Sequence, residues 1–166
     1  MPNTTSNNNR RSFSLGSPTA LIRLSSLLFV FLALGHMSAY PWASTHGDQA
    51  TQLVATMKII DFEFMGEHST YWNLYYGWGL LVGVLLFSVA TILWLVADFV
   101  RLAPKRLGIV AGLLSAVSAV GAYLSFRYFY VPPLVSFAAI CLILLTVAVR
   151  LLRDPARFAA DEAANS

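Results

Sequence analysis

Four long runs of apolar residues, separated by polar segments, organise this chain. They cover about residues 20–40, 74–99, 107–126 and 134–152. Each run is close to the roughly 20 residues that a helix needs to cross about 30 Å of hydrocarbon. The pattern therefore predicts an all-α integral membrane protein, a four-helix bundle formed by one membrane domain over residues 20–152.

The two ends of the chain lie outside these runs. Residues 1–19 are rich in Asn, Ser, Thr and Pro without apolar periodicity, which predicts a disordered tail, and residues 153–166 form a second tail. Arg10 and Arg11, within Asn-Arg-Arg-Ser-Phe, resemble a twin-arginine export motif. Because three more runs follow and Arg23 can help to anchor a first helix, we expect that helix to be retained.

The longest polar stretch between two runs lies at residues 41–73, and loops of such length usually carry structure or function. Thr45 with Asp48 three residues later is a variant of the capping box that begins a helix. An apolar stripe of helical period follows at Leu53, Met57 and Ile60. These signals predict a short amphipathic helix that lies along the membrane surface.

Beyond this stripe the period of the pattern changes. Apolar and acidic residues alternate in the order Ile60, Asp61, Phe62, Glu63 and Phe64. Alternation of this kind indicates a short strand, although a helix that continues to Met65 is an open alternative. Gly66 marks a break in either case.

Lys and Arg are unevenly divided between the two ends of the runs. Of the 11 such residues, nine lie at the ends that share a side with the termini: Arg10, Arg11, Arg23, Arg101, Lys105, Arg106, Arg150, Arg153 and Arg157. Only Lys58 and Arg127 lie at the opposite ends. Because Lys and Arg resist translocation, both termini are predicted to be cytoplasmic, in the cell inner (plasma) membrane, with residues 41–73 as a structured extracytoplasmic loop.

The composition agrees with a membrane protein and limits the chemistry. The chain is 57% hydrophobic and 11% charged, whereas roughly 25% of residues are charged in an average soluble protein. The net charge of +3 comes from residues that flank the runs, so contact with the lipid bilayer is predicted and no nucleic acid is expected. Cys141 is the only cysteine, which excludes a cysteine cage for zinc or iron–sulfur, and no second His lies in a run to bind haem. We therefore expect no cofactor.

Small residues indicate where the helices approach one another. The second run contains Gly79 and Gly83, and the third run contains Gly108, Gly112 and Ala116 at the same spacing. Small residues at i and i+4 let helix backbones approach closely in lipid. We expect these residues to pack helices within the bundle, with the third helix in a central position, and a homo-oligomer interface is the alternative.

Charged residues are missing from the middle third of every run, which counts against a small proton-coupled transporter. Asp98 lies near the cytoplasmic end of the second run, and we expect it to pair with Arg101 or Lys105.

A candidate site lies on the outer side. His36 occurs about one turn inside the outer end of the first run, where a hydrogen bond to the backbone or water is the simpler interpretation. The alternative joins it to loop residues with suitable chemistry: Asp61, Glu63, Glu67 and His68. Imidazole and carboxylates together can bind a divalent cation or act as a general acid and base. Glu67-His68 lacks a second His at i+4, so no metallohydrolase signature is present.

Arg127 is expected to reach the same outer side. An ion pair with Glu63 or Glu67 would be a purely structural clasp, and we favour this clasp over a site.

Several short motifs together resemble a set of uncharacterised small bacterial four-helix integral membrane proteins. The motifs are Gly35-His36, Met57, Phe64-Met65-Gly66 and Tyr71-Trp72-x-x-Tyr75-x-Gly77-x-Gly79-Leu80. The resemblance covers roughly residues 20–152 and is most specific over 57–80. It implies a four-helix inner-membrane protein with both ends inside, and it implies no activity. The architecture is also similar to that of DoxX-like proteins, which says little about function.

The leading functional hypothesis is a non-enzymatic membrane component that binds a lipid-like or protein partner. The first alternative is an outer-face metal-binding protein or membrane enzyme that uses His36 and the Glu63, Glu67 and His68 cluster. The second alternative is a small transporter.

Overall fold

The computed structural model describes residues 16–39 and 47–158. It is mostly helical, at 85%, and contains four long apolar helices, α1 (Pro18–Ala39), α3 (Tyr71–Val96), α4 (Pro104–Tyr128) and α5 (Val131–Arg153). Each is long and apolar enough to cross a membrane. The prediction of four membrane-length helices is confirmed. The first part of the N-terminal tail, Thr45 and the last residues of the C-terminal tail lie outside the described residues. The helix expected after Thr45 begins at Asp48 with Gly47, and not Thr45, in the N-cap position.

The sequence at the helix ends explains where the helices begin. Thr70 caps α3, because its Oγ1 accepts a hydrogen bond from the backbone N–H of Asn73 at 3.1 Å. α4 and α5 both carry proline in the first turn, where a missing N–H removes no helical hydrogen bond. A short 3-10 helix, η1 (Ala97–Val100), follows α3 before the link to α4.

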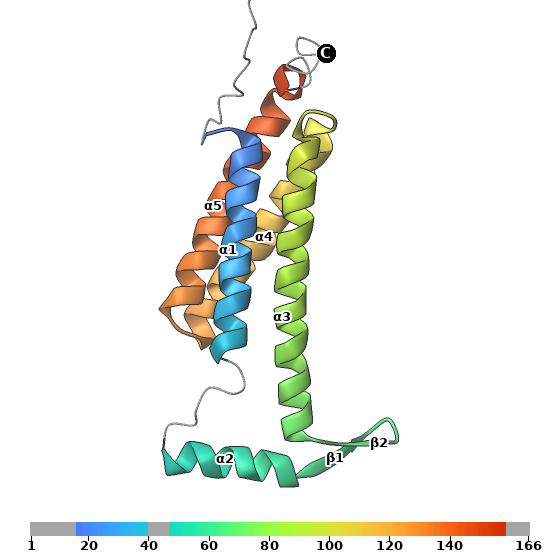
Figure 1. The fold of residues 1–166 in the computed structure, drawn as a ribbon, viewed down its shortest axis with the longest axis vertical. Helices are drawn as coiled ribbons and strands as arrows, with labels where there is room; N and C mark the ends of the chain where they lie inside the picture. Colours follow the sequence, from blue (N-terminus) through green and yellow to red (C-terminus); the bar gives the residue numbers. More distant parts are fainter. Residues whose placement is uncertain (1–15, 40–46, 159–166) are drawn as a thin grey trace, which may run out of the picture.

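The four long helices pack in the order α3, α1, α5, α4 (Figure 1). α1 lies against α3 on one side and α5 on the other, and α5 packs in turn along most of α4. The expectation that the third span, α4, is central was therefore wrong. The small residues of α4 pack mainly against one helix, α5. The two helices in the middle of the bundle are α1 and α5.

The core draws buried residues from all four long helices and η1, and α5 contributes more of them than any other element. In α5, the fully buried side chains recur at helical spacing and belong to Ile140, Leu144, Val147 and Leu151. Phe29 of α1 meets Phe137 of α5 edge to face, with ring centroids 6.4 Å apart. The outward faces of the helices carry exposed Leu, Val and Phe, as expected of surfaces that face lipid.

The segment between α1 and α3 contains α2 (Asp48–Ile59) and an antiparallel hairpin, β1 (Asp61–Phe64) and β2 (Glu67–Thr70). The strand after Ile60, and not a continued helix, is what the chain forms. Met65 and Gly66 make the two-residue turn with φ of 55° and 86°, and two positive φ angles are the signature of a type I′ turn. Figure 1 shows α2 and the hairpin lying across the end of the bundle, transverse to the long helices.

Candidate functional site

The hairpin register determines which of the candidate site residues share a face. Asp61 lies opposite Thr70, and Glu63 lies opposite His68. Residues that face each other across a pair, or alternate along a strand, project to the same side. Asp61, Glu63 and His68 therefore share one face of the hairpin. Glu67 pairs with Phe64 and projects to the other face.

On the first of these faces, the closest contact joins His68 to Asp61. His68 Nδ1 lies 3.8 Å from Asp61 Oδ2, and both side chains are largely exposed. An exposed pair at this distance adds at most about 1 kcal/mol to stability, because water screens it. Across residues 16–39 and 47–158, no three His, Cys, Asp or Glu side chains are placed to hold a metal ion together.

His36 belongs to the contact between α1 and α3. Its Nε2 lies 2.8 Å from the backbone oxygen of Gly79. A carbonyl oxygen can only accept a hydrogen bond, so Nε2 carries the hydrogen and donates the bond to Gly79 of α3. The next residue, Met37, lies against Gly83, where an added Cβ would overlap the Met37 sulfur. The hydrogen bond to the backbone that the sequence suggested for His36 is present, and it joins Nε2 to the neighbouring helix α3.

Arg127 lies near the end of α4, and its side chain is exposed. Figure 1 shows the turn between α4 and α5 on the opposite side of the bundle from the hairpin. Within the part of the chain that the structure describes, Arg127 forms no ion pair with Glu63 or Glu67. The clasp is thus not formed in this structure.

A second polar cluster lies at the other end of the α1–α3 contact. Arg23 Nη2 lies 2.7 Å from Asp98 Oδ1, and the guanidinium carbon lies 5.2 Å from the centre of the Trp94 ring. The expectation that Asp98 pairs with its neighbours in sequence was wrong. Arg23 lies within an apolar run, where an unpaired charge is costly, so it takes the nearest carboxylate across the helix contact. The position of Arg23 inside the run was the signal that could have identified this pair.

A third polar contact lies between these two. Ser26 Oγ of α1 donates to the backbone oxygen of Ala90 in α3 at 2.7 Å, in a buried position. Arg23, Ser26 and His36 therefore bind α1 to α3 at the two ends and between them.

The residues expected to pack helices divide between two contacts. Gly79 and Gly83 are buried in α3 against α1. At Gly108 a Cβ would lie 2.9 Å from Leu152 and 3.2 Å from Leu151, whereas at Gly112 it would lie 3.7 Å from Ala148. Ala116 is exposed. The sequence also places the small residue Ser115 near this motif, and its Oγ donates to the Cys141 carbonyl at 2.9 Å. Sequence reasoning missed Gly121, which lies against Phe137.

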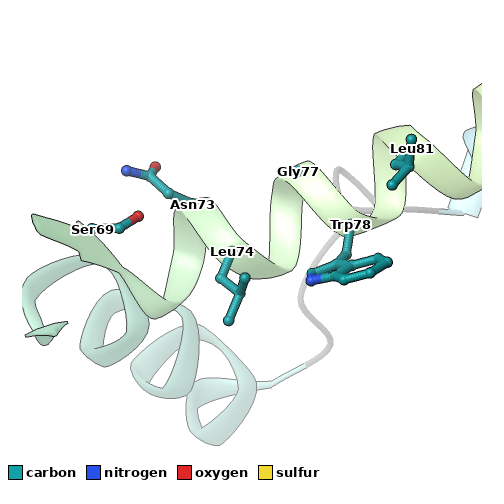
Figure 2. Close-up of a pocket in the computed structure, with 6 residues that line it drawn as sticks. All are labelled: Ser69, Asn73, Leu74, Gly77, Trp78 and Leu81. Carbon is teal, nitrogen blue, oxygen red and sulfur yellow. The ribbon is translucent and has the colours of Figure 1, made fainter. Parts of the chain in front are cut away.

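A shallow depression of about 330 Å³ lies where the hairpin joins α3 (Figure 2). Its lining consists of Ser69, Asn73, Leu74, Gly77, Trp78 and Leu81. Figure 2 shows Leu74 and Trp78 projecting from one side of α3 and Asn73 from the other, with Gly77 between them. A Cβ at Gly77 would meet no atom of the described residues within 4 Å, so this glycine leaves open space beside them. None of the candidate site residues lines the depression.

Comparisons with known proteins do not assign this arrangement to a family. No protein-family model matches the chain, and no curated protein or solved structure matches it either.

Proposed function

We propose that this chain is a non-enzymatic, multi-pass protein of the inner membrane that binds a protein partner through its outer segment, residues 48–70. The observation that carries the proposal is the exposure of this segment. No residue of α2, β1 or β2 is buried, although the segment contains Ile59, which is 79% exposed, and Met65, which is 89% exposed. Apolar side chains that remain open next to a bundle are typical of a binding surface.

The charge of the outer segment supports a protein as the partner. Its carboxylates are Asp48, Asp61, Glu63 and Glu67, and its only Lys or Arg is Lys58. A surface with four carboxylates and one lysine lacks the cluster of basic residues that attracts a segment to anionic lipid head groups, so its charge does not favour lipid as the partner. The same surface is complementary to a protein that presents basic residues around an apolar centre.

Contacts with α3 hold the outer segment in place. Lys58 lies over the ring of Trp72 at 4.9 Å, and Phe62 packs on Tyr71 with ring centroids 5.0 Å apart. The backbone N–H of Tyr71 also donates to the Ile60 carbonyl at 3.3 Å. A surface that is already positioned loses less conformational entropy when a partner binds.

The orientation with both termini in the cytoplasm has support from the bundle geometry. The start of α1, the link between α3 and α4, and the end of α5 lie at one end of the molecule (Figure 1). That end carries the basic residues of the described chain except Lys58 and Arg127. Reporter fusions after Arg106 should read cytoplasmic and fusions at Gly47 should read external. The opposite result would overturn the orientation.

The alternative functions have less support. A metal-binding site would need His36 to lie with the hairpin residues, but among the described residues no group of three His, Cys, Asp or Glu side chains is placed to hold a metal ion. Proton-coupled transport would need a charged group at the middle of a span, and no Asp, Glu, Lys or Arg lies there.

Site-specific photocrosslinking in intact membranes tests the proposed partner. A crosslinking amino acid at Met65 should give one discrete protein adduct, and the same amino acid at exposed Val117 of α4 should not. Charge reversal by Glu63→Lys with Glu67→Lys should remove the adduct while the protein remains folded. An adduct that survives charge reversal, or one with the mass of two copies of this chain, would contradict a basic protein partner.

A further inference from the structure

An open apolar groove separates α3 from α4. These two helices stand at the two ends of the packing order α3, α1, α5, α4 and make no extensive contact with each other. The groove has a volume of about 260 Å³, and its lining consists of Val89, Ile92, Val110, Leu113 and Leu114. A groove of this composition within a membrane-spanning bundle offers no hydrogen-bonding group, so it suits a hydrocarbon chain.

The link that joins the two walls of the groove is strongly basic. It runs from Arg101 to Arg106 and also contains Lys105, and all three side chains are exposed. The nearest acidic residue in sequence, Asp98, is already paired with Arg23 at 2.7 Å. Among residues 16–39 and 47–158, no side chain caps the start of α4, so its positive dipole end adds to the field of the three cations.

The depth of the groove relative to this link fits a phospholipid. Val110 and Leu114 lie five and nine residues after Lys105 along α4. At about 1.5 Å per residue, this places the groove roughly 7–14 Å below the basic link. One leaflet contributes about half of the roughly 30 Å hydrocarbon thickness, so the groove lies within the leaflet whose head groups meet the link.

We propose that the protein binds an anionic phospholipid at this position. The lipid phosphate is held by Arg101, Lys105 and Arg106, and one acyl chain lies in the groove between α3 and α4. The assignment of the cytoplasmic leaflet rests on the orientation proposed above, and this leaflet is the one rich in anionic lipid. A second copy fits the groove less well, because a two-fold contact there would bring like cations together.

Native mass spectrometry of the full-length protein in mild detergent tests the proposal. The probes are phosphatidylglycerol and phosphatidylcholine with identical acyl chains. We expect preferential retention of phosphatidylglycerol and a loss of about 25-fold in Arg101→Gln with Lys105→Gln, since each cation contributes roughly fivefold to anionic lipid affinity. The matched control, Arg153→Gln with Arg157→Gln, removes the same charge from exposed residues at the same end and should change retention less than twofold.

A second pair of variants tests the acyl chain. Val110→Phe fills the groove, whereas Ile109→Phe makes the same change at a neighbouring, similarly exposed residue outside it. Only Val110→Phe should lower phosphatidylglycerol retention, with circular dichroism confirming that both variants fold. Equal losses within either pair, displacement by inorganic phosphate alone, or a dimer that excludes lipid would overturn the site. A cytoplasmic reporter signal at Gly47 would instead refute the orientation and leave lipid retention in detergent unchanged.

Discussion

Arg23 and Asp98 are 75 residues apart in the sequence, and their side chains meet at 2.7 Å. The pair joins the first turns of α1 to η1, at the end of the bundle where the basic residues gather. Trp94 lies under the same guanidinium and adds a cation–π contact. Arg23 therefore joins α1 to its neighbours although it lies within an apolar run. Its two partners are Asp98 of η1 and Trp94 of α3.

A double-mutant cycle should detect this pair. Arg23→Ala and Asp98→Asn should each lower thermal stability in detergent, and their effects should be coupled by about 1 kcal/mol. The coupling is modest because the Asp98 side chain is 67% exposed, against 29% for Arg23. Arg101→Ala with Asp98→Asn is the control, and we expect its two effects to add. Coupling of Asp98 to Arg101, and not to Arg23, would contradict the structure.

Two adjacent serines in α1 should respond to the same substitution in opposite directions. Both are buried, but Ser26 Oγ donates to Ala90, whereas Ser25 Oγ has no hydrogen-bond partner among the described residues. Removing a hydroxyl that is desolvated and unpaired is favourable, and removing a paired one is not. Ser25→Ala should raise stability and Ser26→Ala should lower it, each by about 1 kcal/mol. Thermal unfolding in one detergent measures both, and a loss in both variants would place an unseen partner at Ser25.

Glycines four residues apart in α4 should differ in their tolerance of alanine. A Cβ at Gly108 would lie too close to Leu151 and Leu152, and a Cβ at Gly112 would make an ordinary contact with Ala148. Overpacking a close helix contact costs about 1–3 kcal/mol. Gly108→Ala should lower the unfolding temperature, while Gly112→Ala should leave it nearly unchanged. Equal effects would mean that α4 and α5 are equally close at both positions.

The number and length of the spanning helices could be predicted from the sequence, but their neighbours could not. Hydropathy reports only that a segment prefers lipid, and any of the four helices satisfies that requirement in any order. The small residues of the third span indicated close packing at Gly108, which the structure contains. They did not indicate which helix lies opposite. That depends on matched shapes, such as Phe137 against Gly121, which no single segment shows.

The arrangement of the outer polar residues could also be predicted only in part from the sequence. Alternation after Ile60 indicated the strand and hence that Asp61 and Glu63 share a face. The register of the second strand, which brings His68 and not Glu67 to that face, depends on the two-residue turn at Met65 and Gly66. A one-residue change in the turn would exchange the two side chains. Sequence alone left that choice open.

The last prediction concerns His36 and distinguishes a helix contact from a metal or acid–base site. Because His36 Nε2 donates to the Gly79 carbonyl, His36→Ala should lower stability by about 1 kcal/mol through the lost hydrogen bond. The effect should add to that of Asp61→Asn or Glu63→Gln within about 0.5 kcal/mol, since the hairpin residues belong to a separate contact. Ser26→Ala, which removes another hydrogen bond between α1 and α3, is the positive control. If divalent cations raised the unfolding temperature, and His36→Ala and Glu63→Gln each removed that rise, His36 would belong to a site with the hairpin and the helix-contact interpretation would fail.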